Sequence, residues 1–296
     1  MFTGLSAFPL TPLIEDRFDE AAHAGLITRL IDAGVDSIGA LGSTGSYAYL
    51  DRDERHQVAR ASVREADGVP VVVGIGALRT SHVQALAEDA QQAGASAVLL
   101  APMSYQPLTD EDVFGLYEDV TAELSVPLVV YDNPGTTHFT FSTELYARIA
   151  ALPNVAAIKI PPVPLDAAAA RKRIDAIRAL VPGHVSIGVS GDSAASTGLN
   201  AGCQSWFSVV GGTVPEAVLP IVRAAQEGDP AGALAHSERL RPLWELFAAH
   251  GSLRVTAAIA EHLGLVAPRC LPRPVLGLST SQRENVVRVV EELHLS

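Results

Sequence analysis

One lysine is a candidate nucleophile because of where it lies. The chain has 21 lysine and arginine residues, and only Lys159 and Lys172 are lysines. Lys172 lies between two arginines, whereas Lys159 lies in the apolar run Ala156–Ile160. Burial lowers the pKa of an ammonium group, and the neutral amine can attack a ketone to form an imine, which arginine cannot do. Lys159 therefore indicates Schiff-base chemistry, unless its side chain simply extends from a strand end to solvent.

A turn rich in hydroxyl groups is the candidate site for a carboxylate. Leu41–Ser46 reads Leu-Gly-Ser-Thr-Gly-Ser, and a helix is expected to begin just beyond it at Asp51. The hydroxyls of Ser43 and Thr44, together with backbone N–H groups of the turn, can bind a carboxylate. Because Gly, Ser and Thr are also common in ordinary turns, a purely structural turn is the open alternative.

A phenol at the end of another apolar run could transfer protons. Tyr131 ends the run Val126–Tyr131. A hydroxyl in that position can move a proton to and from a substrate hydroxyl or an imine carbon. The alternative is a packed aromatic residue whose hydroxyl has a structural partner. Asn133-Pro134-Gly135, directly after it, is interpreted as a turn.

Two glycine-containing loops favour a different chemistry. Ser190-Gly191-Asp192 and Gly211-Gly212-Thr213 follow the last two predicted strands. In many barrels of parallel strands these two loops bind phosphate, so a phosphosugar isomerase is the alternative from another enzyme class. The histidines lack the spacing of metal ligands, so we do not expect a metal site.

The elements that would position these residues form a repeating pattern of buried strands and helices. Near-continuous apolar runs are typical of strands that are buried on both faces of a parallel sheet. Such runs occur at Leu5–Phe8, Val35–Leu41, Pro70–Ile75, Ala97–Ala101, Val126–Tyr131, Val155–Ile160, His184–Val189 and Ser205–Val210. Helical patterns separate them, with predicted N-caps at Asp51, Thr109 and Ser281.

Eight strands alternating with helices predict an α/β fold, a (β/α)8 TIM barrel with a small C-terminal helical extension. We place the barrel at residues 1–228 and a helical tail packed on it at residues 229–296, because the latter contains helical patterns and no strong strand. In this fold the functional groups lie at the C-terminal ends of the strands. The candidate residues named above are therefore expected to meet at one end of the barrel.

The composition of the chain limits the kinds of binding partner and the cellular location that we expect. The formal net charge is −12, and without a basic stripe nucleic acid binding is not expected. Mean hydropathy is +0.24, but no apolar run approaches the roughly 18 residues of a membrane-spanning helix. The N-terminus lacks a signal-peptide pattern, and two cysteines make no disulfide framework, so we predict a cytoplasmic location.

Three of these motifs together resemble one family. Gly42–Gly45, Tyr131 and Ile158-Lys159 resemble the dihydrodipicolinate synthase/N-acetylneuraminate lyase family of class I pyruvate-type aldolases. Thr11-Pro12 and Pro102-x-x-Tyr105-x-Pro107 are also similar to the family pattern. The resemblance implies a homotetramer, a dimer of dimers, that binds a small-molecule 2-oxo acid and needs no metal or organic cofactor. It implies Lys159, Tyr131 and Thr44 as catalytic residues.

The resemblance also implies a substrate site. Lys159 would form the imine, Ser43 and Thr44 would hold the carboxylate, and Tyr131 would transfer the proton. The expected substrate-binding residues, including those in loops that we expect to determine the rest of the substrate, are Ser43, Thr44, Thr136, Phe207, Tyr105, Gly191 and Asp192.

Several positions depart from the family pattern. Thr136 occupies the place of an arginine that grips the aldehyde's carboxylate in dihydrodipicolinate synthases, and a hydroxyl cannot replace a bidentate guanidinium. Met103 and Ser104 replace two tyrosines, leaving open whether Tyr105 substitutes for them, and Ser46 replaces an acidic residue. We therefore predict an aldolase or dehydratase on pyruvate or a 2-oxo-3-deoxy sugar acid, not dihydrodipicolinate synthase itself. A catalytically silent, ligand-sensing member is the remaining alternative.

Overall fold

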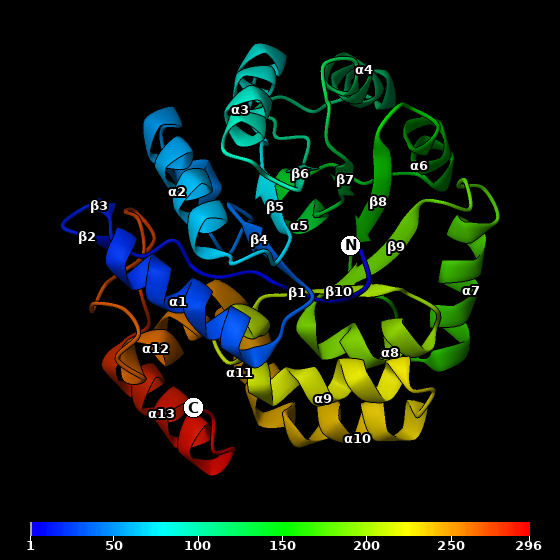
Figure 1. Cartoon of the computed structure of the whole chain (residues 1–296). Helices are drawn as coiled ribbons and strands as arrows, with labels where there is room; N and C mark the ends of the chain where they lie inside the picture. The colour runs from blue at the N-terminus through cyan, green and yellow to red at the C-terminus, as the bar shows by residue number, and fades with distance from the viewer. Residues whose placement is uncertain (1) are drawn as a thin grey trace.

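The computed structural model describes residues 2–296 and contains a closed barrel of eight parallel strands (Figure 1). Around the barrel the strand order is β1-β10-β9-β8-β7-β6-β5-β4, and β1 pairs with β4 to close it. The strands are β1 (Gly4–Ala7), β4 (Ser37–Ala40), β5 (Val71–Gly74), β6 (Ala97–Leu100), β7 (Leu128–Tyr131), β8 (Val155–Ile160), β9 (Ser186–Ser190) and β10 (Ser205–Ser208). The predicted TIM barrel and all eight predicted strands are thereby confirmed, with ends that differ by two residues at most.

Helices surround the barrel (Figure 1). Those of the first 228 residues are α1 (Glu20–Ala33), α2 (Arg52–Glu65), α3 (Thr80–Gln92), α4 (Asp110–Thr121), α5 (Pro134–Thr137), α6 (Thr143–Ala150), α7 (Ala167–Arg178), α8 (Ala195–Asn200) and α9 (Pro215–Gln226). Predicted caps explain where two of them begin: Asp51 and Thr109 each form a capping box with the residue three positions later. The segment Asn133–Gly135, interpreted as a turn, instead contains the N-cap of the short helix α5, Asn133, and the first two residues of that helix.

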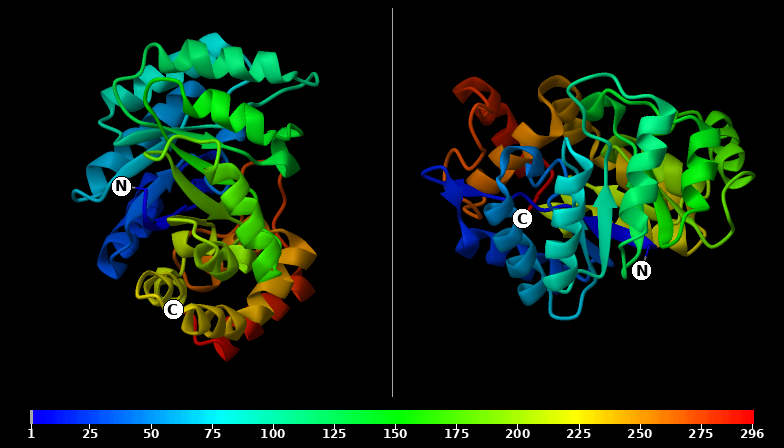
Figure 2. Two further views of the ribbon diagram at one scale, coloured as in Figure 1. Left: turned by 90° about the vertical axis from the view of Figure 1, so that its right-hand side faces the viewer. Right: turned by 90° about the horizontal axis from the view of Figure 1, so that it is seen from above.

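The C-terminal region is helical (Figure 2). Its residues Ala257 and Ala260 pack in one apolar cluster with Leu10 and Leu26. It contains α10 (Pro230–Arg239), α11 (Arg241–His250), α12 (Ser252–His262) and α13 (Thr280–Glu292). The N-cap of α13 is Ser279, two residues before the predicted Ser281, because Ser279 and Gln282 form the capping box. α10, which follows residue 228, packs on α8 and α9, which precede it. This packing does not test the predicted domain boundary at residue 228, which stays a prediction.

Side chains of the strands alternate between two cores. Val72 points into the barrel interior, where it packs with Phe8, Val129 and Phe207, while Val71 and Val73 belong to the larger core between the strands and the helices. Both faces of β5 are thus apolar, which is why its sequence shows no alternation of polar and apolar residues. A short antiparallel hairpin, β2 (Leu13–Ile14) and β3 (Arg17–Phe18), lies outside the barrel and was not predicted.

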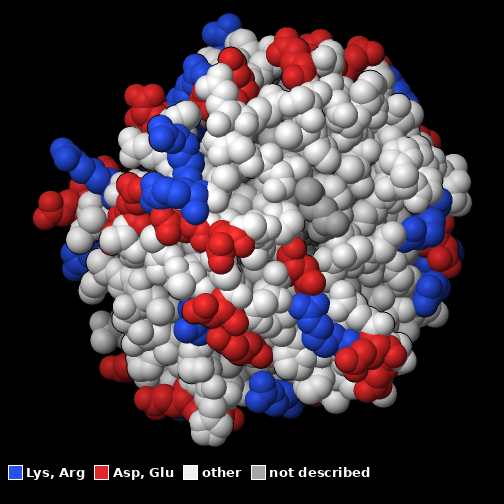
Figure 3. Space-filling view, viewed as in Figure 1, with Lys and Arg blue, Asp and Glu red and all other residues white. Residues whose placement is uncertain are grey.

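The surface and the helices give two further observations. On the face in Figure 3, acidic and basic side chains form small neighbouring groups, and that face presents no continuous basic area. Among residues 2–296, no helix is both long enough and apolar enough to cross a membrane.

Candidate functional site

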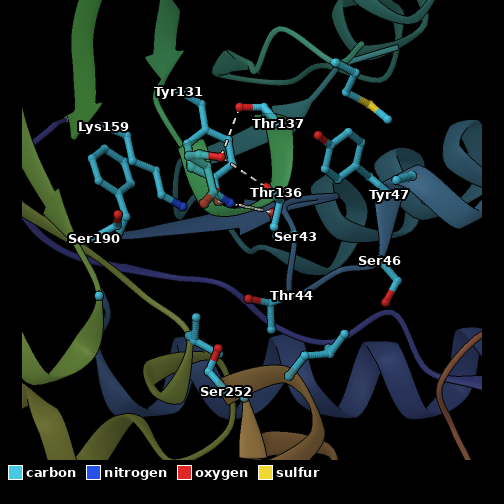
Figure 4. Close-up of a pocket in the computed structure, with 18 of the residues that line it drawn as sticks. Ser43, Thr44, Ser46, Tyr47, Tyr131, Thr136, Thr137, Lys159, Ser190 and Ser252 are labelled. Carbon is cyan, nitrogen blue, oxygen red and sulfur yellow. Dashed lines mark hydrogen bonds between the residues drawn. The ribbon is translucent and has the colours of Figure 1, made fainter. Parts of the chain in front are cut away.

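The pairing of two adjacent strands places the lysine beside the tyrosine. Tyr131 of β7 and Lys159 of β8 are partners in the parallel register, and each lies at or next to the C-terminal end of its strand. The backbone N–H of Asp132 donates to the carbonyl oxygen of Lys159 at 3.0 Å. Both side chains line one cavity at this end of the barrel (Figure 4). The register therefore brings together two groups that are 28 positions apart in sequence.

Lys159 is buried among aromatic rings. Its side chain is 5% exposed, and Nζ lies 4.0 Å from the ring centroids of Phe8 and Tyr131 and 5.5 Å from that of Phe207. Loss of hydration lowers the pKa of Lys159 to about 7, and the negative charge of Asp192 acts weakly in the opposite direction. Within residues 2–296, no carboxylate lies within ion-pairing distance of Nζ. A large fraction of the amine is thus neutral, and nucleophilic, near pH 7.

A glycine in the hydroxyl-rich turn makes room for one of these rings. A Cβ atom on Gly42 would lie 2.5 Å from Cδ1 of Phe8, closer than packed atoms approach. The absence of a side chain at Gly42 therefore lets the Phe8 ring pack close to the lysine. The turn contributes to the site through this space as well as through its hydroxyl groups.

The hydroxyl of Tyr131 belongs to a small network. Asn133 Nδ2 donates to Tyr131 Oη at 2.8 Å and to Ser43 Oγ at 3.4 Å, and the oxygens of Ser43 and Tyr131 share a hydrogen bond of 3.2 Å. Burial raises the pKa of Tyr131, while the two hydrogen bonds act to lower it. Tyr131 is consequently a neutral phenol, and because either hydroxyl can donate in the bond between them, a proton can pass between Tyr131 and Ser43. The sequence pattern predicts only a turn at Asn133, so it does not indicate that this side chain binds Tyr131 and Ser43.

Seven of the predicted site residues line a cavity of about 510 Å³. They are Ser43, Thr44, Tyr131, Thr136, Lys159, Gly191 and Phe207. Thr44 is 4% exposed and forms no side-chain hydrogen bond to another described residue. Thr136 lies near the surface, where its hydroxyl donates to the carbonyl oxygen of Asn133 at 3.4 Å. The barrel thus gathers residues from three strands, β7, β8 and β10, and from the segments that follow β4, β7 and β9.

Two predicted substrate-binding residues do not line this cavity. Tyr105 is 89% exposed, because its loop turns outward after β6. Asp192 is 5% exposed and accepts hydrogen bonds from Trp206 Nε1 at 3.1 Å and from the backbone N–H groups of Val209 and Val210 at 3.1 and 2.8 Å. These donors occupy its carboxylate, which therefore holds the connection after β10 in place instead of facing a ligand.

The two glycine-containing loops do not form a joint phosphate site. Gly191 lines the cavity in a left-handed conformation at φ +81°, and a Cβ there would lie 2.3 Å from Cγ of Pro162. Gly212 instead packs on the backbone of Phe8, where a Cβ would meet the carbonyl oxygen at 2.0 Å, and it does not line the cavity. The arrangement expected for a phosphosugar isomerase is therefore not present among the described residues.

Several residues that the sequence did not single out complete the cavity. Tyr47 comes from the short turn after Ser46, and Ser252 and Leu253 begin α12. Nothing in the sequence connects Ser252 with Lys159, because only the packing of the C-terminal helices brings α12 to this end of the barrel. Residues 2–296 contain no group of three or more His, Cys, Asp or Glu side chains suited to a metal ion.

Comparison with known proteins decides the family. The model of the dihydrodipicolinate synthetase family matches residues 1–293. This chain belongs to that family. The resemblance carried by Gly42–Gly45, Tyr131 and Lys159 is thereby confirmed, and so is the predicted enzyme class, because the family comprises class I aldolases and lyases.

Relatives and solved structures match over nearly the whole chain. A 4-hydroxy-tetrahydrodipicolinate synthase of Phenylobacterium zucineum (strain HLK1) is 30% identical over 297 residues, 100% of this chain and 98% of the relative. The crystal structure of a dihydrodipicolinate synthase from Agrobacterium tumefaciens str. C58 is 44% identical, with a TM-score of 0.95 over 99% of this chain and 98% of the other. One from Thermotoga maritima is 25% identical, with a TM-score of 0.92 over 100% of both chains.

Proposed function

We propose that the protein is a Schiff-base-forming lyase in which the Lys159 amine attacks C2 of a 2-oxo acid, such as pyruvate or a 2-oxo-3-deoxy sugar acid. The observation that carries this proposal is the environment of Nζ: it is buried among three rings, has no carboxylate partner within ion-pairing distance among residues 2–296, and lines the main cavity. Such an amine is neutral often enough to form an imine at physiological pH.

The carboxylate of the 2-oxo acid would bind at the turn after β4. Thr44 offers a hydroxyl without a hydrogen-bond partner among the described residues, and Ser43 offers another that is already oriented by Tyr131 and Asn133. Hydrogen bonds to a charged carboxylate are stronger than neutral ones, so these donors would fix the acid with its C2 near Lys159. Phe207 would pack against the bound acid from β10.

Cleavage would then proceed through the imine. Lys159 and the C2 ketone form the imine with loss of water. With the imine protonated, Tyr131 accepts the proton of the C4 hydroxyl and passes its own to Ser43, which passes its proton to the substrate carboxylate that it binds. The C3–C4 bond breaks at the same time, and its electron pair neutralises the protonated imine to give an enamine. An aldehyde leaves, the relay returns the proton to C3, and hydrolysis releases pyruvate and the free amine. Proton transfer of this kind contributes about 10²–10⁴-fold to the rate.

Dehydration is the second reaction that the same residues support. The imine also acidifies C3, so the relay of Tyr131 and Ser43 could accept the C3 proton, and departure of the 4-hydroxyl would then remove water instead of breaking the C3–C4 bond. Tyr131 would then protonate the leaving hydroxyl. The two reactions share every residue named so far, so we include both in the proposal.

We further propose that condensation of pyruvate with aspartate semialdehyde is not the main activity, although the curated relatives at about 30% identity are named 4-hydroxy-tetrahydrodipicolinate synthase. The support is Thr136, which lines the cavity where the family pattern has a carboxylate-binding arginine. Losing such a charge-assisted contact costs on the order of 10²-fold in kcat/KM. Slow synthase turnover in an assay coupled to dihydrodipicolinate reductase is the expected result.

Borohydride trapping tests the proposal directly. Pyruvate and borohydride together should add one pyruvate-derived mass to the peptide that contains Lys159, and a Lys159→Arg variant should remain unlabelled. Lys172, the second lysine, is exposed and acts as an internal control. Labelling of Lys172 alone, or of neither lysine with any 2-oxo acid, would exclude the Schiff-base mechanism. Trapping without turnover of any acid would favour the silent, ligand-sensing alternative.

We also propose a homotetramer of the kind that the family resemblance implies, and a cytoplasmic location. The support for the location is the sequence pattern described above, with its two unpaired cysteines, Cys203 and Cys270. Sedimentation equilibrium of the purified protein should give a mass of about four chains of 31.0 kDa. A mass equal to one chain would contradict the tetramer and leave the chemistry at Lys159 untouched.

A further inference from the structure

The cavity extends beyond the lysine into a region between the turn after β4 and the first turn of α12. Figure 4 shows Tyr47 and Ser46 on the opposite side of the view from Lys159, with Ser252 below Thr44. Met103 and Leu253 also line this region. A substrate attached to Lys159 would reach these residues with the carbons beyond its imine, so they are placed to select the remainder of the substrate.

Two hydroxyl groups in this region have no protein partner. Neither Tyr47 nor Ser252 donates or accepts a side-chain hydrogen bond among residues 2–296. Both residues line the cavity, and neither hydroxyl oxygen is fully buried. Burial of a polar group without a hydrogen bond is costly, so such groups are normally paired with water or a ligand. A hydroxylated ligand would satisfy both, because a hydroxyl can donate one hydrogen bond and accept others.

The Tyr47 ring is held firmly in position. The guanidinium of Arg55 lies 5.4 Å from its ring centroid and is itself fixed by the carbonyl oxygens of Gly76 and Gly74 at 2.9 and 2.8 Å. Because these carbonyls bind the guanidinium, and Arg55 does not line the cavity, its charge is not offered to a ligand. The phenol hydroxyl is therefore a rigid neutral group, which gives directional selectivity at small entropic cost.

The lining of the cavity is uncharged apart from the nucleophile. Among the described residues that line it, Lys159 is the one charged side chain, and Thr136 and Ser46 stand where the family pattern has an arginine and an acid. A second carboxylate or a phosphate buried here would lose hydration without gaining a charge partner, which disfavours its binding. Hydroxyl groups avoid the penalty.

We propose that the part of the substrate beyond the imine is uncharged and hydroxylated, and that Tyr47 and Ser252 are specificity-determining residues that bind its hydroxyl groups. This inference rests on the proposed imine at Lys159. It identifies the aldehyde half as a neutral polyhydroxy aldehyde in the cleavage direction. If the enzyme instead removes water, the product keeps this uncharged, hydroxylated part of the carbon chain.

Four six-carbon 2-oxo acids test the inference whichever reaction follows the imine. They are 2-oxo-3-deoxygluconate with a hydroxylated tail, its 6-phosphate, 2-oxoadipate with a carboxylate, and 2-oxohexanoate with an apolar tail. The measurement is the concentration that half-saturates borohydride trapping at Lys159, counting adducts of the whole acid and of its pyruvate fragment. The hydroxylated acid should half-saturate at a concentration at least tenfold lower than each of the others.

The outcomes distinguish a failure of the imine mechanism from a failure of the proposed selectivity of the cavity. Failure to trap pyruvate or any of the four acids would overturn the imine mechanism itself. Trapping of pyruvate together with equal or tighter binding of 2-oxoadipate or the 6-phosphate would overturn the uncharged site alone. Equal binding of 2-oxohexanoate would overturn the assignment of hydroxyl recognition.

Variants assign the selectivity to residues. Tyr47→Phe and Ser252→Ala should each raise the half-saturating concentration of 2-oxo-3-deoxygluconate about three- to tenfold relative to that of pyruvate, as expected for one lost hydrogen bond. Ser193→Ala, an exposed serine outside the cavity, is the control and should not change that ratio. Thr136→Arg should lower the half-saturating concentration of 2-oxoadipate at least tenfold. An unchanged ratio in both Tyr47→Phe and Ser252→Ala would refute their role.

Discussion

Replacing Lys159 by methionine should stabilise the protein, and the gain should depend on pH. The folded protein holds the pKa of Lys159 at about 7, whereas an unfolded chain has the ordinary value of 10.5. Between these pH values the unfolded chain binds more protons, so the stability of the native protein rises with pH through this window and is lost as pH falls towards 7. Methionine has a similar length and no charge, and it removes this dependence.

The magnitude follows from the two pKa values. One pH unit corresponds to about 1.4 kcal/mol, so protonating the buried amine below pH 7 costs the wild-type protein about 5 kcal/mol. At pH 9 most of the folded amine is already neutral, and the remaining cost is about 2 kcal/mol. The stabilisation by Lys159→Met should therefore be about 3 kcal/mol larger at pH 6 than at pH 9.

Denaturant unfolding of both proteins at pH 6 and pH 9, at equal protein concentration, measures this difference. Lys172→Met is the matched control, because Lys172 is exposed on α7 and its replacement should change the unfolding free energy little at either pH. A gain from Lys159→Met that is the same at both pH values, or larger at pH 9, would refute the claim that burial depresses the pKa of this lysine.

Three other substitutions test the site. Tyr131→Phe should reduce kcat for cleavage or dehydration by about 10²–10⁴-fold while pyruvate is still trapped at Lys159; an unchanged kcat would exclude Tyr131 from proton transfer. Gly191→Ala should lower the unfolding free energy by at least about 1 kcal/mol, measured by denaturant titration, because its φ of +81° and the close approach of Pro162 both oppose a Cβ. Asp192→Ala should destabilise the protein by about 3 kcal/mol, because three buried N–H groups lose their acceptor, and a loss smaller than 1 kcal/mol would contradict its structural role.

The barrel could be predicted from the sequence because each strand is recognisable from its own residues alone. Each strand is buried on both faces, so its residues form an apolar run that is visible without any knowledge of its neighbours, as in Val71–Val73. Strand ends were predicted less accurately, since they depend on which backbone groups find partners in the adjacent strand. The hairpin of β2 and β3 has two residues in each strand and leaves too short a pattern to detect.

The residues around the reacting amine were also accessible from the sequence. A lysine in an apolar run is unusual, and in this fold a position at the C-terminal end of a strand already indicates a role in the site. Parallel pairing of neighbouring strands then places Tyr131 next to Lys159. The contact of Asn133 with Tyr131 could not be predicted, because the sequence does not show in which direction a side chain in a turn points.

The sequence by itself determined the strands, the family and the buried lysine, because each depends on the types of residues at nearby positions. Only the tertiary structure decided which loop residues face the cavity. Tyr105 and Asp192 both follow strands, but the first is exposed and the second is held by Trp206 and two backbone N–H groups. Ser252 lies 93 positions after Lys159 and lines the same cavity because the C-terminal helices pack back against the barrel, a contact between distant segments that no local pattern encodes.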